Sequence, residues 1–178
     1  MKLNALIGSG MAAVFALTLA ACGGGGNSGG EDVPTLRRGI SAKVDTLDPH
    51  KSSAQWENIV IGDMFIGLTT DGPDARPQPG MATHWETSED GLVWTFHLGD
   101  YNWSDGTPVT ANDFVFALRR IQAPEVASQY ASLLYLIKNA AKVNATELPP
   151  EELGVRAIDD KTLEITLEYP APYLPGLL

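Results

Sequence analysis

Residues 94–120 read WTFHLGDYNWSDGTPVTANDFVFALRR, and this stretch decides the fold of the chain. Apolar and more polar residues alternate where it begins, and this period of two predicts a strand over residues 92–98 with one buried face. The Asp-Gly pair ending at Gly106 predicts a tight turn, because glycine adopts the positive φ that other residues resist. Thr110 then precedes an apolar pattern of helical spacing, and Asp113 follows three residues later, as in a capping box. The stretch therefore predicts a strand, a turn and a capped helix, with no obvious catalytic group.

Other elements are expected on both sides of this stretch. Residues 83–87 predict a strand that pairs with residues 92–98 across a turn at Gly91. A second hairpin is expected at residues 155–167, where Leu163 and every second residue after it alternate with polar residues.

Helical spacing of apolar residues predicts a helix over residues 55–68, which Gly67 would end as a C-terminal cap. Residues 133–141 also have a helical pattern. A short strand is expected at residues 38–44, before the turn that contains Pro49.

Two motifs in the opening stretch carry a resemblance to a known family. Residues 94–98 read WTFHL and residues 103–115 read WSDGTPVTANDFV. They resemble the pattern W-T-F-x-L-R followed by W-S-D-G-x-P-V-T-A-x-D-F-V, with Gly99 in place of the usual arginine. This pattern belongs to the extracytoplasmic solute-binding proteins of bacterial ABC importers, in the family of the oligopeptide- and dipeptide-binding proteins. The resemblance extends over residues 36–178.

The resemblance implies a mixed α/β fold, the periplasmic-binding-protein-like class II fold, in which a hinge joins two lobes that enclose the ligand. Family members are much longer than this chain, so we expect an incomplete form of that fold. Residues 31–65 would form the first segment of lobe I. Residues 66–178 would form most of the small additional domain, domain II, that distinguishes the peptide-binding branch.

The resemblance also implies where a ligand would be contacted. In the peptide-binding branch the peptide is extended and pairs through its backbone with strand-like segments, which is β-augmentation. The family segment that follows the L-D-P-x motif corresponds to Ser53, Ala54 and Gln55, and the tyrosine of the A-S-x-Y-A motif corresponds to Tyr130. Taken as residues alone, Tyr130 fits a core aromatic equally well, and the other three fit a surface turn.

The partners implied by the resemblance are an oligopeptide ligand and the permease subunits of an ABC transporter. We expect a monomer without a cofactor, on the periplasmic or extracytoplasmic face of the cell envelope. Two alternatives stay open: a truncated family member, and a lipid-anchored surface binding protein without transport activity.

The N-terminus predicts a lipoprotein. Lys2 precedes an uncharged apolar run at residues 12–21, which has the outline of a secretory signal and is short for a membrane span. The run ends in Leu-Ala-Ala-Cys, which resembles a lipobox, so residues 1–21 would be the signal peptide and Cys22 the lipidation site. Residues 22–30 would comprise this cysteine and a glycine-rich tether. Cys22 is the only cysteine, which excludes a disulfide within the domain.

Charge and composition exclude several classes of function. With 12 Lys and Arg against 22 Asp and Glu, the chain has a net charge of −10, which argues against nucleic acid and against electrostatic attachment to anionic lipid. No nucleophile or metal-helix motif is present, so we expect no enzyme. Asp45, Asp48 and His50 could be imagined as metal ligands, but their spacing matches no strong metal motif, and we expect no metal site.

Overall fold

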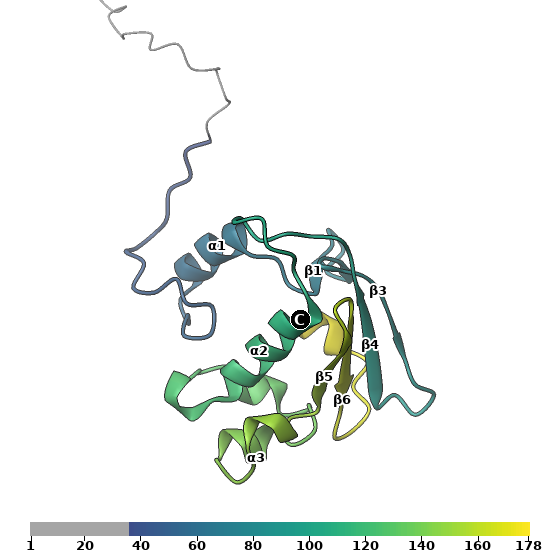
Figure 1. Cartoon of the computed structure of the whole chain (residues 1–178). Coiled ribbons are helices and arrows are strands. Elements are labelled where there is room, and N and C mark those ends of the chain that lie inside the picture. The colour runs from purple at the N-terminus through teal and green to yellow at the C-terminus, as the bar shows by residue number, and fades with distance from the viewer. Residues whose placement is uncertain (1–35) are drawn as a thin grey trace, which may run out of the picture. The chain divides into compact units, whose positions relative to one another are not determined.

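The larger of the two sheets is four-stranded and antiparallel, in the spatial order β3-β4-β6-β5, and it lies on one side of the structure (Figure 1). Its strands are β3 (Ala82–Thr87), β4 (Val93–Leu98), β5 (Val155–Asp159) and β6 (Thr162–Thr166). The computed structural model describes residues 36–178, of which Ile40–Leu178 form one unit. The predicted signal peptide and the predicted lipidation site, Cys22, with its tether lie outside the described residues.

The buried face of the sheet follows from the alternation in the sequence. Phe96 is fully buried in β4 and lies opposite Leu163 of β6, while Trp94 lies opposite Ile165. Leu163 and Ile165 are also fully buried. The two predicted hairpins are confirmed, because β3 pairs with β4 and β5 pairs with β6.

The predicted turns are confirmed at their glycines. Gly91 has a φ of +71° and connects β3 to β4, and Gly106 has a φ of +89°. Asp105 stabilises the second turn, since its Oδ1 accepts hydrogen bonds from the backbone N–H and the hydroxyl of Thr107 at 2.9 and 2.7 Å.

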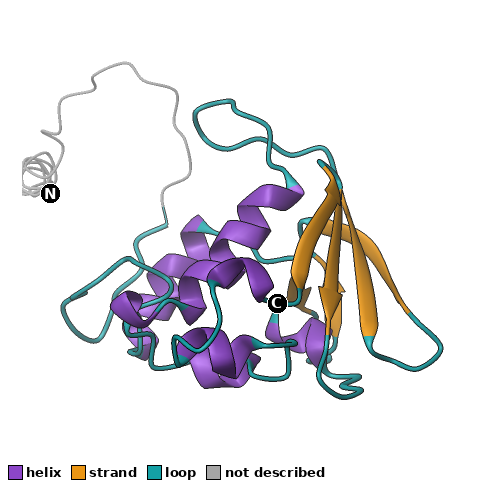
Figure 2. Ribbon diagram, turned by 60° about the horizontal axis from the view of Figure 1, so that its bottom comes forward, coloured by secondary structure: helices purple, strands orange, loops and turns teal. Residues whose placement is uncertain are grey.

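Helix α2 (Ala111–Gln122) packs against β5 and β6. Its capping carboxylate is in place, because Asp113 Oδ2 accepts the backbone N–H of Thr110 at 2.8 Å. Val115 and Leu118 are buried. In Figure 2 the helices gather beside one face of the sheet, so the main core lies between that face and α2.

Helix α1 (Gln55–Met64) confirms the predicted helix but not its predicted end. The helix ends at Met64, because Phe65 is already extended with φ −128° and ψ 153°. The predicted cap at Gly67 is therefore wrong. Gly67 instead lies where two chain segments approach closely, since a Cβ there would be 2.1 Å from the carbonyl oxygen of Leu178. A two-stranded sheet follows, formed by β1 (Thr69–Asp71) and β2 (Pro77–Pro79).

Two other predictions are corrected. Residues 133–141 do not form one helix: a 3₁₀ turn at Ala131–Leu134 is separated from α3 (Ala140–Asn144) by Asn139, whose φ is +64°. The reason is tertiary, because Lys138 donates its N–H to Thr166 of β6. The predicted strand at residues 38–44 is wrong, because these residues belong to neither of the two sheets in the described part of the chain.

The remaining helical elements are 3₁₀ turns, at Pro124–Val126, Pro150–Glu152 and Leu174–Leu177. Sheet and helices together make a mixed α/β structure, as predicted. Within the described part of the chain, no helix has the length and apolar character needed to cross a membrane.

Candidate functional site

The loop of residues 45–54, called here the 45–54 loop, lies directly before α1 and carries two of the residues predicted to contact a ligand. It contains no helix or strand, so its backbone N–H groups need other acceptors. Glu57 of α1 is the acceptor for four of them. Glu57 Oε1 accepts the N–H groups of Asp45 and Thr46, both at 3.1 Å. Its Oε2 accepts those of Ser53 and Ala54, both at 3.3 Å.

The Glu57 side chain is 4% exposed. Burial raises the pKa of a carboxyl group, but the hydrogen bonds from Thr46, Ala54, Asp45 and Ser53 outweigh it and hold the pKa of Glu57 below its ordinary value. Glu57 is therefore an ionised carboxylate that connects the two ends of the loop.

The middle of the 45–54 loop is held by Arg120, in the last turn of α2. The guanidinium donates two hydrogen bonds to Asp48, from Nη1 to Oδ1 at 2.8 Å and from Nη2 to Oδ2 at 2.6 Å. This paired geometry is among the stronger forms of a charged hydrogen bond. The bonds from Arg120 hold the pKa of Asp48 well below its ordinary value despite partial burial, and the same contact raises the pKa of Arg120.

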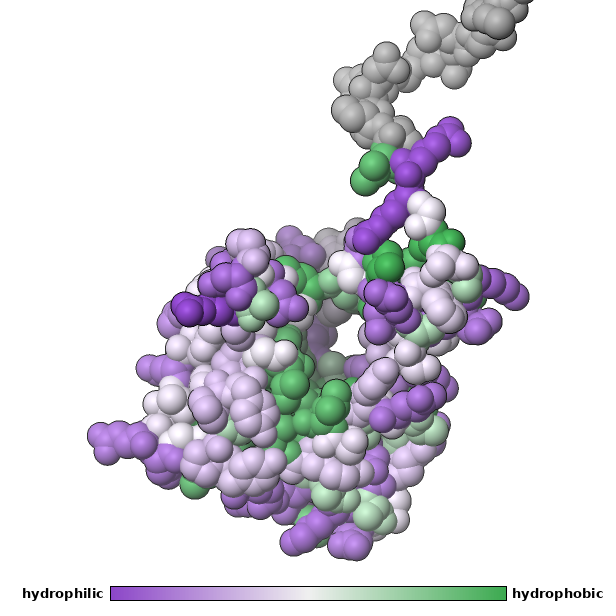
Figure 3. All heavy atoms as spheres, turned by 180° about the vertical axis from the view of Figure 1, so that it is seen from behind, coloured by the Kyte–Doolittle hydropathy of each residue, from purple (hydrophilic) through white to green (hydrophobic). Residues whose placement is uncertain are grey.

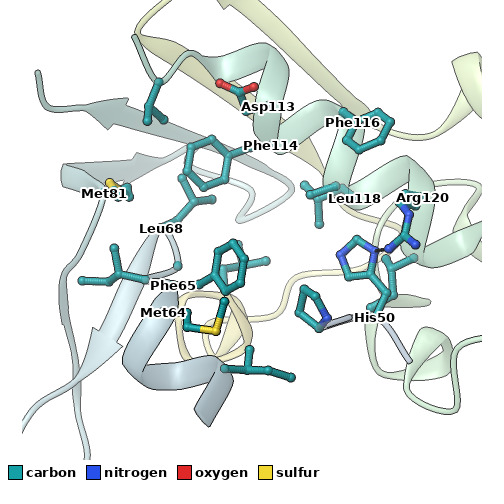
Figure 4. Close-up of a pocket in the computed structure, with 18 of the residues that line it drawn as sticks. His50, Met64, Phe65, Leu68, Met81, Asp113, Phe114, Phe116, Leu118 and Arg120 are labelled. Carbon is teal, nitrogen blue, oxygen red and sulfur yellow. Dashed lines mark hydrogen bonds between the residues drawn. The ribbon is translucent and has the colours of Figure 1, made fainter. Parts of the chain in front are cut away.

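His50 completes this contact. Its Nδ1 lies 2.9 Å from Arg120 Nη1, as the dashed line in Figure 4 shows. Burial and the charge of Arg120 lower the pKa of His50 from its ordinary value of 6.5, so the imidazole is neutral at pH 7. Because arginine has no acceptor, Nδ1 must be the accepting nitrogen.

Tyr130, which follows α2 in the chain, contacts the same loop. Its hydroxyl donates a long hydrogen bond of 3.4 Å to the carbonyl oxygen of Ser53, 77 residues earlier in the sequence. Tyr130 is 44% exposed, and Ser53 and Gln55 are exposed as well. The structure thus brings Tyr130 to the predicted ligand-facing segment.

The orientation of that segment limits how it can pair with a peptide. Glu57 already accepts the N–H groups of Ser53 and Ala54. The carbonyl of Ser53 has a second lone pair, and the side chains of Ser53 and Gln55 lie at the surface. A ligand would therefore meet an acceptor and two polar side chains there.

An apolar groove of about 1110 Å³ lies between α1 and α2, and Pro49, His50 and Arg120 also line it. Figure 3 shows apolar side chains gathered where the surface is hollowed, and Figure 4 shows Phe65, Phe114 and Leu118 converging from both sides. None of the four predicted contact residues lines it. Several large lining residues are exposed: Met64, Phe65, Ile66, Trp103, Phe116 and Leu177.

Sequence reasoning missed Glu57, Arg120 and the groove. Glu57 is the third residue of α1, the position of the acidic partner in a capping box, so its role had a visible signal. Arg120 is near the C-terminal end of α2, where a cation is expected from the helix dipole alone, so its position gives no signal of a contact with Asp48. The signal for the groove is Phe116, a large apolar residue of α2 that does not share the burial of Val115 and Leu118.

Among the described residues, no group of three His, Cys, Asp or Glu is placed to hold an ion. Asp48 and His50 are instead both hydrogen-bonded to Arg120.

Comparison with known proteins identifies the family. Residues 76–178 match the family described as "Bacterial extracellular solute-binding proteins, family 5 Middle". The chain is 45% identical over 150 residues to the periplasmic oligopeptide-binding protein OppA of Salmonella typhimurium, covering 83% of this chain and 27% of that protein. It is 39% identical over 172 residues to the oligopeptide-binding protein OppA of Bacillus subtilis, covering 92% of this chain and 32% of that protein.

Solved structures give the same result. The structure of Listeria monocytogenes OppA bound to peptide matches with a TM-score of 0.75 and 37% identity, over 77% of this chain and 27% of that chain. The fold is thus that of part of an OppA-type binding protein, as predicted. The chain spans roughly a quarter to a third of the length of these relatives. Its matched segment and the likeness of its fold show that it belongs to the bacterial extracellular solute-binding proteins, family 5.

Proposed function

We propose that this chain belongs to a substrate-binding component of an ABC transporter, which binds oligopeptides outside the cytoplasmic membrane for import. One observation carries the proposal: the hydroxyl of Tyr130 lies 3.4 Å from the carbonyl oxygen of Ser53, although the two residues belong to separate motifs. The names of the relatives, which are binding proteins and not enzymes, support the same reading.

The proposed ligand contacts are Ser53, Ala54, Gln55 and Tyr130. An extended peptide would lie along the surface of the 45–54 loop and use the carbonyl of Ser53 as an acceptor. Such backbone recognition depends little on peptide side chains, which suits a binding protein for many sequences.

The proposal keeps the domain assignment made from the resemblance. Residues 31–65 would contribute to lobe I and residues 66–178 to the small domain II. Cys22 would be lipidated and would hold the protein at the outer face of the membrane, close to the permease subunits. Substitution of Cys22 by serine, followed by metabolic labelling with a radioactive fatty acid, tests the anchor.

Peptide titration tests the function. The mature chain, with Cys22→Ser to remove the anchor, is titrated with trialanine and trilysine by calorimetry. We expect binding weaker than micromolar, because sites of this kind bury most of their ligand and the residues present supply one side only. Tyr130→Phe should weaken binding several-fold.

A matched control is available in Tyr101. Its hydroxyl also donates to a carbonyl, that of Gly80, at 3.4 Å. Tyr101→Phe removes the same kind of bond at a tyrosine that is not among the proposed contacts, and it should leave peptide affinity unchanged. Equal affinities for the two tyrosine variants would contradict the proposed contact at Tyr130. Micromolar binding by the unsubstituted chain would contradict only the expectation that its affinity is weak.

A further inference from the structure

The 45–54 loop is held at three points, each time by a side chain and not by pairing with a strand or helix. Glu57 accepts N–H groups at both ends, Arg120 binds Asp48 in the middle, and Tyr130 contacts Ser53 near the exit. Compact surface loops of this length with joined ends are frequently functional.

Glu57 is the most central of these contacts. One carboxylate oxygen binds the first two residues of the loop and the other binds the last two. Removing the carboxylate therefore leaves four backbone N–H groups, two at each end of the loop, without their acceptor. A single side chain thus joins the two ends of the segment that precedes α1.

Arg120 adds a contact from another part of the chain. Arg120 belongs to α2, which packs on β5 and β6 of the sheet. Its two bonds to Asp48 therefore connect the loop to the packed core. A lysine could supply the charge but not the paired geometry.

We propose that Glu57, supported by Arg120, is a positioning residue that holds Ser53 and Ala54 in the conformation that meets the peptide. This inference rests on the proposed function for the identity of the ligand. It adds that affinity depends on a buried carboxylate that itself touches no peptide. A loop already held in its bound conformation loses less entropy on binding, which is how such a residue would raise affinity.

Amide hydrogen exchange, measured by NMR on the mature Cys22→Ser chain, tests the positioning directly. Glu57→Gln preserves size but removes the charge and one of the two acceptor oxygens. We expect the amides of Asp45, Thr46, Ser53 and Ala54 to exchange at least ten-fold faster as a group, and Arg120→Lys to produce a smaller increase.

Asp113→Asn is the matched control, because Asp113 also accepts a backbone N–H at the start of a helix. It should lower the thermal midpoint without changing exchange in the 45–54 loop. Trialanine affinity should fall at least three-fold in Glu57→Gln and stay unchanged in Asp113→Asn. Unchanged loop exchange in Glu57→Gln would overturn the positioning role, whatever happens to the thermal midpoint.

The two proposals fail in different ways. If the chain binds trialanine and Glu57→Gln binds it equally well, the positioning inference is wrong and the proposed function stands. If the unsubstituted chain shows no trialanine binding even at millimolar concentration, the proposed function fails and takes the peptide part of the inference with it. In that case the amide hydrogen exchange rates still show whether Glu57 holds the loop.

Discussion

The stretch of residues 94–120 and the 45–54 loop are held in place by different means. The first is built from β4, a turn and α2, and its apolar side chains enter the core, with Phe96 fully buried. The second has no regular secondary structure and is held by polar side chains outside it, chiefly Glu57 and Arg120.

This difference separates what identifies the family from what would contact a ligand. The dense motif around Trp103 is a scaffold, since its conspicuous residues form a turn and a helix cap. The loop is less conspicuous in sequence, yet it presents Ser53 to Tyr130. Substitutions in the scaffold should therefore change global stability, whereas substitutions around the loop should act locally.

The largest effect is expected from Phe96→Ala. Removing a fully buried aromatic side chain from the centre of the sheet should lower the free energy of unfolding by about 3–5 kcal/mol. Phe116→Ala is the control, because that side chain is 67% exposed and should change the same quantity by less than about 0.5 kcal/mol. Urea unfolding followed by tryptophan fluorescence measures both. Equal losses would show that α2 and the sheet do not form the core described here.

Most of the scaffold could be predicted because its signals are local. Alternation in residues 92–98 and the glycines of two turns determine backbone conformation within a few residues. The predicted helix at residues 133–141 is wrong, because Lys138 does not make helix bonds there. Its N–H is donated to the carbonyl of Thr166 in β6, and its carbonyl accepts the N–H of Gly154. Such long-range pairing leaves no periodic signal.

The candidate site was predictable only through the resemblance. Nothing in the spacing of Arg120 and Asp48, 72 residues apart, indicates that they meet. The same holds for Tyr130 and Ser53. A contact between single polar side chains depends on how α2 is placed against the loop, and that placement follows from packing of the whole unit.

An intermediate effect is expected at the hairpin between β3 and β4. Gly91 has a φ of +71°, and an added Cβ would lie 3.2 Å from Pro170, so Gly91→Ala should cost about 1–2 kcal/mol. Gly62 lies inside α1 with open space around it, and Gly62→Ala should stabilise the protein by about 0.5–1 kcal/mol. Thermal and urea unfolding of both variants give the sign and size. A stabilising Gly91→Ala would mean that this turn is not the one described.

The smallest effect on global stability is expected at the 45–54 loop, and it should depend on pH. Arg120 holds the pKa of Asp48 in the folded protein below its ordinary value of 3.8. The ion pair therefore contributes stability above about pH 4, and that contribution is lost as the pH falls through the folded-state pKa. At pH 7, Asp48→Asn should lower the free energy of unfolding by about 0.5–1 kcal/mol, because both side chains are partly exposed and water screens the pair.

The difference between this variant and the unsubstituted chain should shrink as the pH is lowered below 4. His50 causes a separate loss of stability below its ordinary pKa of 6.5, because its pKa is lowered in the folded protein. The variant and the unsubstituted chain are therefore compared at each pH. Asp74→Asn is the control, since the Asp74–Arg76 pair is 3.5 Å long and mostly exposed, and it should have no measurable effect at any pH. A pH-independent loss in Asp48→Asn would assign the contribution of the Asp48 side chain to the hydrogen bond that its Oδ1 accepts from the backbone N–H of His50, and not to the ion pair with α2. The position of the loop would then depend on Glu57 more than on α2, and the contrast between the two regions would be sharper still.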